Sequence, residues 1–411
     1  MNLKIKLVLL FLAIGLIPVA VVGLISYTIA SNNIEAEVVD KLDLYANIKS
    51  QDLQDYFQAR VKDGRVIATT RDVYQSLYIL QGGAQQGAVI GEVGDTTDPM
   101  WQARVAIMND LLTTADREYG YEFTFITDSN GICVFSTNPE VLGADLSGRD
   151  YIQGSLSGNS TWSELFFSTV INENALVIST PVYSGGTSGD IVGTFNILFS
   201  DTIISAVIHD GLDAIGQSAD GYLVRSDFTM LSNMRFGDFA SGAALVEKMQ
   251  SEATEPLVEP IQAGNFDFHE IKRYTNYLGN PVIGSLKVSL LGNEAVGFVV
   301  QVNQAEVFAG VNNMRTLMLI IIAVSLVAII VLGFMIANNI AKPVQQVAEV
   351  AGQIAGGDFT VETKIKRKDE IGQLAQAFNT MSESLRALIS TAVEMSTGVN
   401  SGSESVSAAS E

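Results

Sequence analysis

The chain has 411 residues, of which 47% are hydrophobic, and it carries a formal net charge of −21. Such acidity argues against nucleic acid and against an anionic membrane surface as partners. The one cysteine, Cys133, excludes an intrachain disulfide, so each folded domain must be held together by an apolar core.

Two apolar runs are long enough to cross a membrane. After a short polar start at residues 1–6, residues 7–30 contain no charged side chain, and residues 316–337 form a second run. A spanning helix needs about 20 residues. A cleavable signal peptide is the alternative for the first run, but the run is too long and Pro18 lies in its middle. We therefore expect two transmembrane helices.

Positive charges indicate the orientation of both spans. Lys4 and Lys6 precede the first span, and Lys342 with a basic run at residues 364–368 follows the second. By the positive-inside rule, both termini face the cytoplasm and residues 31–313 lie outside. That external segment holds 15 Lys and Arg against 36 Asp and Glu, so it carries the whole net charge. The expected location is the inner (plasma) membrane, as a multi-pass protein.

The external segment begins with helices and continues as strands. Residues 31–70 keep a helical apolar stripe, residues 82–99 are rich in Gly, Asp and Thr and predict a loop, and residues 100–118 predict another helix. Alternating apolar residues then predict five antiparallel strands, at residues 121–127, 132–136, 162–168, 175–182 and 191–199. Asp-Ser-Asn-Gly at residues 128–131 predicts a tight turn between the first two strands, and a helix at residues 201–208 follows the last.

A second, smaller α+β unit comes next. We expect a hairpin at residues 221–232, a helix at residues 243–249, and three strands at residues 266–273, 281–290 and 295–303. The order of a hairpin, a connection and three strands thus occurs twice, which is a weak internal repeat. Residues 304–313 become helical again and lead toward the second span.

The external segment resembles a double Cache domain, in which a long helix from the membrane carries a distal and a proximal module of PAS-like shape. The resemblance is carried by the segments at residues 128–131, 143–151, 178–182, 191–196, 221–224 and 230–236. It implies an α+β extracytoplasmic domain made of two antiparallel-sheet modules. The distal module would occupy about residues 71–200 and the proximal module about residues 211–303.

Two heptad tracts follow the second span. The apolar residues of the first tract are Ile340, Val344, Val347, Ala351 and Ile354, and those of the second are Ile371, Leu374, Phe378, Met381, Leu385 and Leu388. Gly356 and Gly357 stop the first helix, and Asp369 can cap the second. Each tract is too short to be stable alone. We therefore predict that a homodimer forms a parallel four-helix coiled-coil bundle.

These residues also resemble a HAMP linker, here residues 338–390. The resemblance rests on Ala-Lys-Pro at residues 341–343, Ile-Ala-Gly-Gly-Asp-Phe at residues 354–359 and Asp-Glu-Ile-Gly-Gln-Leu at residues 369–374. Residues 391–411 are rich in Ser, Ala and Gly, and they resemble the start of a methyl-accepting signalling helix.

Taken together, these segments resemble a methyl-accepting chemotaxis protein that is truncated before its signalling tip. The resemblance implies a dimeric transmembrane chemoreceptor that passes a ligand signal through the second span and the linker to a cytoplasmic kinase and a coupling protein. One alternative is the sensory half of a histidine kinase or nucleotide cyclase with its catalytic domain beyond residue 411, although no phosphoacceptor histidine follows His269. Another is a receptor without an output domain that works through a partner chain.

A candidate ligand site lies between the second and third strands of the distal module. Arg149 and Tyr151 occur here, and Trp162 begins the next strand. An arginine beside aromatic side chains offers a fork for a carboxylate or amide and a flat apolar wall. The alternative is structural: Arg149 pairs with Asp145 or Asp150, and the aromatic side chains belong to the core.

The family resemblance adds Ser179, Tyr183 and Asn196, from the fourth and fifth strands, to this site. Members that bind amino acids carry an acidic residue near the place of Asn196, which holds the ligand ammonium. The resemblance therefore implies that this chain favours an organic acid or a neutral metabolite over an amino acid.

No motif for hydrolysis, phosphoryl transfer or metal chemistry occurs in the external segment, and His209 and His269 stand alone. Residues 128–131 are similar to the start of a calcium loop, but the later ligands and the closing Glu are missing. We expect neither enzyme activity nor a metal or cofactor.

Overall fold

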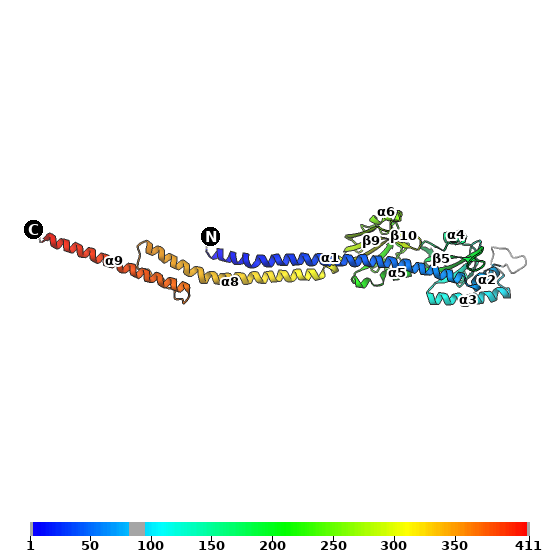
Figure 1. The fold of residues 1–411 in the computed structure, drawn as a ribbon, viewed down its shortest axis with the longest axis horizontal. Helices are drawn as coiled ribbons and strands as arrows, with labels where there is room; N and C mark the ends of the chain where they lie inside the picture. Colours follow the sequence, from blue (N-terminus) through cyan, green and yellow to red (C-terminus); the bar gives the residue numbers. More distant parts are fainter. Residues whose placement is uncertain (1–2, 82–94, 409–411) are drawn as a thin grey trace. The chain divides into compact units, whose positions relative to one another are not determined.

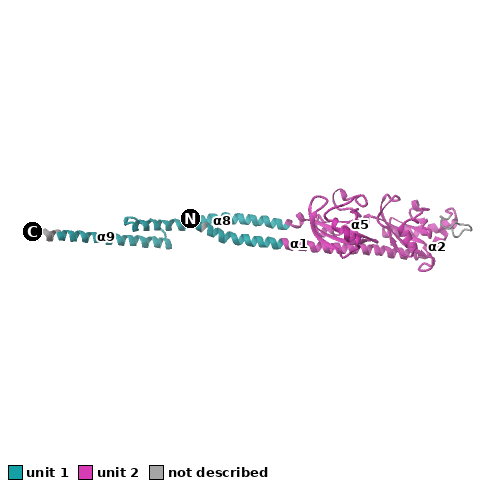
Figure 2. Cartoon of the chain, turned by 90° about the horizontal axis from the view of Figure 1, so that it is seen from above, with its two compact units in different colours: residues 1–30, 310–411 teal, residues 31–309 magenta. Residues whose placement is uncertain are grey.

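The computed structural model describes residues 3–81 and 95–408. The chain divides into two compact units, which Figure 2 shows in separate colours: residues 31–309, and residues 1–30 together with 310–411. Most of the loop that the sequence predicts at residues 82–99 lies outside the described residues.

Three helices open the larger unit. α1 spans Leu3–Ala68 and thus continues from the first apolar run into this unit, where Leu42, Leu53 and Phe57 are buried. α2, Arg71–Leu80, was not expected from the sequence, and it buries Val73, Leu77 and Leu80. α3, Pro99–Tyr119, begins where Asp98 accepts a hydrogen bond from the backbone N–H of Met100, as a helix cap does.

The distal module is built on one antiparallel sheet. Its strands are β1 Phe123–Asp128, β2 Cys133–Ser136, β3 Thr161–Trp162, β4 Phe166–Ser168, β5 Glu173–Tyr183 and β6 Ile191–Ser200, in the order β2-β1-β6-β5-β3 with β4 also paired to β5. The turn after β1 is tight, as predicted, with Gly131 at φ +82°. The single strand expected at residues 162–168 is in fact β3 and β4.

The connections between the strands of the distal module contain a break in pairing and short helices. Between β3 and β4, Ser163 bonds to the backbone of Val177 through its own N–H and through its hydroxyl, so the chain leaves regular pairing there. Between β2 and β3 lie a short 3-10 turn, η1 Pro139–Val141, and a helix that the sequence did not predict, α4 Asp150–Leu156. After β6, α5 Thr202–His209 leads to the proximal module.

The proximal module contains a four-stranded antiparallel sheet in the order β7-β10-β9-β8. Its elements are η2 Leu212–Ala214, β7 Asp220–Val224, η3 Gly237–Phe239, η4 Glu255–Leu257, α6 Val258–Gln262, β8 His269–Thr275, β9 Pro281–Leu291 and β10 Glu294–Asn303. The expected helix at residues 243–249 is wrong. Leu245 has φ +63° and bonds to Met230, and Lys248 bridges to Thr229, so backbone pairing replaces the helix.

The second strand of the hairpin expected at residues 221–232 is also missing. Only isolated pairing remains there, because Met230 bridges to Val224 and the N–H of Leu231 bonds to the carbonyl of Leu223. Met230 and Leu231 are nonetheless fully buried. Their apolar side chains therefore pack as strand residues do, without a continuous ladder.

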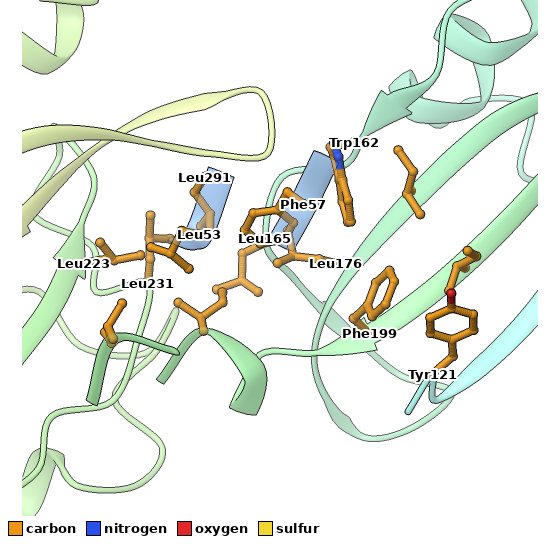
Figure 3. Close-up of a cluster of buried hydrophobic side chains, with 14 of the residues drawn as sticks. Leu53, Phe57, Tyr121, Trp162, Leu165, Leu176, Phe199, Leu223, Leu231 and Leu291 are labelled. Atoms are coloured by element: carbon orange, nitrogen blue, oxygen red, sulfur yellow. The ribbon is translucent and has the colours of Figure 1, made fainter. Parts of the chain in front are cut away.

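The two modules share one hydrophobic core. Figure 3 shows Leu53 and Phe57 of α1 between side chains of both modules, with Trp162 and Leu165 on the distal side and Leu291 on the proximal side. Each of these side chains is at most 7% exposed. Because burial of apolar surface is the main driving force of folding, this cluster ties the modules together.

In the part of the smaller unit that the structure describes, two helices are long and apolar enough to span a membrane, one from α1 and the other α8, Ala309–Ala355. They pack through glycine: a Cβ on Gly15 would lie 2.6 Å from Ile329 Cδ1, and a Cβ on Gly23 would overlap Met318. α7, Gln304–Val307, precedes α8. Small residues that permit close approach are typical of packed transmembrane helices.

The linker after α8 follows the predicted stop and start signals. α8 ends at Ala355, Gly357 has φ +95°, and α9 spans Glu370–Ala408. Asp369 Oδ1 accepts a hydrogen bond from the N–H of Gly372 at 3.1 Å, which caps α9.

Candidate ligand site

α4 lies over one face of the distal sheet, and α1 lies over the other (Figure 1). Tyr151 and Ile152 of α4 are buried against Phe125 of β1 and Val177 of β5. Arg149 directly precedes the helix, with extended backbone angles, and its carbonyl accepts the first hydrogen bonds of α4. The start of α4 thus positions Arg149 next to the apolar face of the helix that packs on the sheet.

An inner cavity of about 150 Å³ lies between α4 and the sheet. It is lined by Phe123, Phe125, Val141, Leu146, Arg149, Tyr151, Phe166, Phe167, Ser168, Thr169, Val170, Val177 and Leu198. Arg149 is the one charged residue in this lining. The cavity therefore combines an apolar chamber with a single cationic group.

An outer cavity of about 600 Å³ shares three lining residues with the inner one: Arg149, Tyr151 and Phe166. The outer lining is Gly148, Arg149, Asp150, Tyr151, Trp162, Ser163, Glu164, Phe166, Asn293 and Glu294. Arg149 thus borders both cavities. Asn293 and Glu294 come from the proximal module, so the outer cavity has walls from both modules.

The side chain of Arg149 contacts an aromatic ring. Its guanidinium carbon lies 5.8 Å from the centroid of Phe166. Within the described residues no ion pair joins Arg149 to Asp145 or Asp150, and Asp145 Oδ1 instead accepts the N–H of Ser147 at 3.0 Å. A guanidinium in cation–π contact with a ring can still donate its N–H groups to a ligand.

Two predicted site residues form a buried polar pair that borders neither cavity. Ser179 and Asn196 lie opposite each other on β5 and β6, and both are 0% exposed. Asn196 Nδ2 donates to the carbonyl of Phe125 and to Thr194 Oγ1. Asn196 Oδ1 and Ser179 Oγ have no hydrogen-bond partner among the described residues, which is uncommon for buried polar atoms.

Tyr183 lies elsewhere. It lines a separate cavity of about 280 Å³ together with Arg65, Ser160 and Thr180. Of the six residues predicted from the sequence, the structure brings together Arg149, Tyr151 and Trp162 at the outer cavity.

Seven residues of the outer cavity were not among the predicted site residues: Gly148, Asp150, Ser163, Glu164, Phe166, Asn293 and Glu294. Phe166 lies in the same predicted strand as Trp162, at residues 162–168, so its closeness to Trp162 in the sequence could have indicated it. No local signal pointed to Asn293 or Glu294, because only the packing of the two modules brings them to the cavity that Arg149 lines.

Burial changes the acidity of two groups near the site, Tyr151 and Cys133. It raises the pKa of Tyr151 to about 12, and it raises the pKa of Cys133 to about 12. Tyr151 is therefore a neutral hydroxyl near neutral pH, and Cys133 is a thiol rather than a thiolate. The site can bind and orient a ligand through Arg149, but these two groups supply no nucleophile.

Among the described residues, no group of three or more His, Cys, Asp or Glu side chains is arranged to hold a metal ion. The carboxylate of Asp128, at the start of the calcium-like segment, accepts hydrogen bonds from the N–H groups of Asn130 and Ile132. It stabilises the turn between β1 and β2.

In a comparison with known protein families, residues 335–387 match the HAMP domain. Among curated relatives, the sensor protein kinase WalK of Staphylococcus haemolyticus is 36% identical over 93 residues, or 22% of this chain and 15% of the relative. A putative sensory transducer protein of Acetivibrio thermocellus is 41% identical over 71 residues, or 17% of this chain and 13% of the relative. The chain thus spans a small part of the length of these relatives.

Two solved sensory domains resemble the chain in shape. That of the Campylobacter jejuni chemoreceptor Tlp3 with isoleucine bound has a TM-score of 0.45 at 9% identity, covering 67% of this chain and 97% of that one. That of the V. cholerae histidine kinase DctB has a TM-score of 0.43 at 12% identity, covering 68% of this chain and 100% of that one. Likenesses this distant decide neither the fold nor the ligand. The HAMP match supports a sensor that signals through this domain, either a chemoreceptor or a sensor kinase.

Proposed function

We propose that the chain is a transmembrane receptor that binds a small organic anion in its external unit and signals through α8 and the HAMP domain. The observation that carries the proposal is that the unit with the cavities, the apolar helix α8 and the HAMP match follow one another directly along the chain. The HAMP match begins at residue 335, inside the apolar helix α8, and the unit that precedes this helix contains the Arg149 cavities. A ligand that favours one of two states of that unit can shift the packing of the helices that follow.

The ligand class follows from the inner cavity. Its single charged residue is Arg149, whose guanidinium matches a carboxylate in a bidentate pair. A cavity of about 150 Å³ lined by apolar side chains can hold a body about the size of benzene. No acidic residue lines this chamber to pair with an ammonium. We therefore favour an organic acid, or a neutral metabolite with a carbonyl group, over an amino acid.

The signalling form is a homodimer. In the single chain, Ile340, Leu374 and Met381 of the heptad tracts are 43–48% exposed, and Leu388 is 67% exposed. Apolar a and d positions are buried when helices associate in a coiled coil. A parallel four-helix bundle from two chains would cover these side chains and make the linker responsive to small helix movements.

The proposed output is that of a methyl-accepting chemoreceptor, which acts on a cytoplasmic kinase and coupling protein and catalyses no reaction itself. A second candidate is the sensory half of a histidine kinase. The 36% identity over 93 residues to a sensor kinase favours it, while the transducer relative favours the first.

A thermal-shift screen of short carboxylic acids against the full chain in detergent tests the proposal. A ligand at one hundred times its Kd stabilises the folded protein by about 2.7 kcal/mol. We expect at least one acid to raise the melting temperature of the wild type and of Arg117→Ala, a control whose side chain is 73% exposed. Arg149→Ala should fold normally and lose this shift. An equal shift in Arg149→Ala would exclude this site.

A further inference from the structure

We infer that the ligand site is shared by the two modules: the tip of the β9–β10 hairpin supplies its second half through Asn293. The ligand would then carry, beside its carboxylate, a hydrogen-bond donor that reaches this tip. This inference rests on the proposed function, and it adds a residue of the proximal module and a second ligand group to it.

The shape of the hairpin brings its tip to the distal module. Leu291 pairs with Glu294, so Gly292 and Asn293 form a two-residue turn. Gly292 has φ +61°, and a positive φ at the first turn residue is typical of a type II′ hairpin. A Cβ on Gly292 would lie 3.0 Å from Trp162 Cβ, so glycine allows the turn to lie directly against the wall of the outer cavity.

An ion-pair cluster holds the tip in place. Arg225 binds both carboxylate oxygens of Glu294, and its Nη2 lies 3.0 Å from Oε2. The same Nη2 lies 3.4 Å from Glu164 Oε2 and donates to the carbonyl of Leu165 at 3.4 Å, both in the distal module. The side chains of Arg225 and Glu294 are only 20% and 19% exposed. Partly buried bidentate pairs fix geometry well, so Asn293 is held at the cavity.

The chemistry of the outer cavity differs from that of the inner one. Asp150 and Glu164 are hydrogen-bond acceptors, and Asn293 offers an amide oxygen. The negative charge of Glu294 is already balanced by its ion pair with Arg225. A carboxylate bound at Arg149, between the cavities, would direct an apolar body inward and a neighbouring donor group outward. The class that fits is a small 2-hydroxy acid, with its hydroxyl group beside the carboxylate.

The hairpin tip is also the start of the strand that leads to the membrane helix. β10 runs from Glu294 to Asn303 and continues directly into α7 and then α8. At the far end, the Glu306 carboxylate accepts hydrogen bonds from the N–H groups of Gln217 and Ser218, at 2.7 and 2.9 Å. A ligand that contacts Asn293 therefore acts on one end of a strand whose other end precedes the second span.

Trp162 allows a direct measurement, because the sequence contains only one other tryptophan, Trp101. In the full chain with Trp101→Phe, the fluorescence of Trp162 reports on the outer cavity. The probes are 4-methylpentanoate and 2-hydroxy-4-methylpentanoate, which differ by one hydroxyl group. Titrations are made without a further change, and with Asn293→Ala, Arg149→Ala or Asn280→Ala. Asn280, at the opposite end of β9, is the control.

We expect the hydroxy acid to bind about tenfold more tightly than the plain acid, as a hydrogen bond in a desolvated site allows. Asn293→Ala should remove this preference and leave the Kd of the plain acid within about twofold, while Arg149→Ala abolishes binding of both. If binding of the acids were lost with Arg149→Ala and unchanged with Asn293→Ala, the shared site would be overturned and the proposed function would stand. If Asn293→Ala alone changed binding, by removing the preference for the hydroxy acid, the shared site would stand. Arg149 would then be excluded as the residue that binds the carboxylate. No response to either acid would overturn both.

Discussion

Ser179 on β5 and Asn196 on β6 lie opposite each other in the distal sheet, and both residues are fully buried. Within residues 3–81 and 95–408, each keeps one side-chain oxygen without a hydrogen-bond partner. An unsatisfied buried oxygen lowers the stability of the folded state, since it loses its bonds to water on folding. The pair is therefore a weak point of the distal sheet. Neither residue lines the two cavities at Arg149.

Ser179→Ala should accordingly leave the unfolding free energy unchanged or raise it by up to about 1 kcal/mol, because it removes an unsatisfied hydroxyl. Ser163→Ala is the matched control: Ser163 Oγ accepts the N–H of Val177 at 2.8 Å, so its loss should cost about 1 kcal/mol. Urea unfolding of both variants measures the difference. A larger loss in Ser179→Ala than in Ser163→Ala would contradict this view of the pair.

Gly292→Ala should destabilise the larger unit, because alanine at a positive φ is strained and the new methyl group would press on Trp162. Gly264→Ala separates the two effects: Gly264 has φ +60°, and its Cβ would meet nothing within 4 Å. We expect a cost of about 1 kcal/mol for Gly264→Ala and a larger one for Gly292→Ala. Equal melting temperatures for the two variants would show that the tip does not pack tightly against Trp162.

His209 should make stability depend on pH. Burial lowers its pKa, its Nε2 lies 2.9 Å from the carbonyl oxygen of Gly221, and the carboxylate of Asp220 and the guanidinium of Arg235 are the charges that act on it. The unfolded chain therefore binds a proton at His209 more readily than the folded chain does. The unfolding free energy should fall as the pH drops below about 6.5, and His209→Gln should reduce this loss. A steeper fall of the unfolding free energy in His209→Gln would show that the direction assigned to the pKa shift of His209 is wrong.

Cysteines at Leu374 and Phe378 should cross-link between chains in membrane vesicles, because these seam positions meet in a four-helix bundle. Cysteines at Gln373 and Gln376, which are exposed in the single chain, provide the comparison. Cross-linking that is no faster at Leu374 and Phe378 than at the two glutamine positions would exclude the bundle.

Reporter fusions test the orientation of the chain in the membrane. The positive-inside rule predicts that residue 200 lies outside and residue 345 inside. A periplasm-active reporter should give signal at residue 200 alone, and a cytoplasm-active reporter at residue 345 alone. The same compartment for both positions would contradict two spans with cytoplasmic termini.

Local rules on the sequence predicted those features that depend on neighbouring residues. They include the turn after Asp128, and the helix stop at Gly357 with the new cap at Asp369. In each case a side chain or a glycine acts on backbone groups within a few positions. Such effects need no knowledge of the rest of the fold.

Contacts between distant segments could not be predicted in this way. The sequence analysis placed Tyr183 at the candidate ligand site, but Tyr183 lines another cavity, and no local pattern indicated that Asn293 and Arg149 line the same cavity. The helix expected at residues 243–249 is absent because the backbone of Leu245 pairs with Met230 instead. Strand order and the packing of both modules on α1 decide these positions. They depend on the combined burial of side chains from the whole unit, which no short stretch of sequence contains.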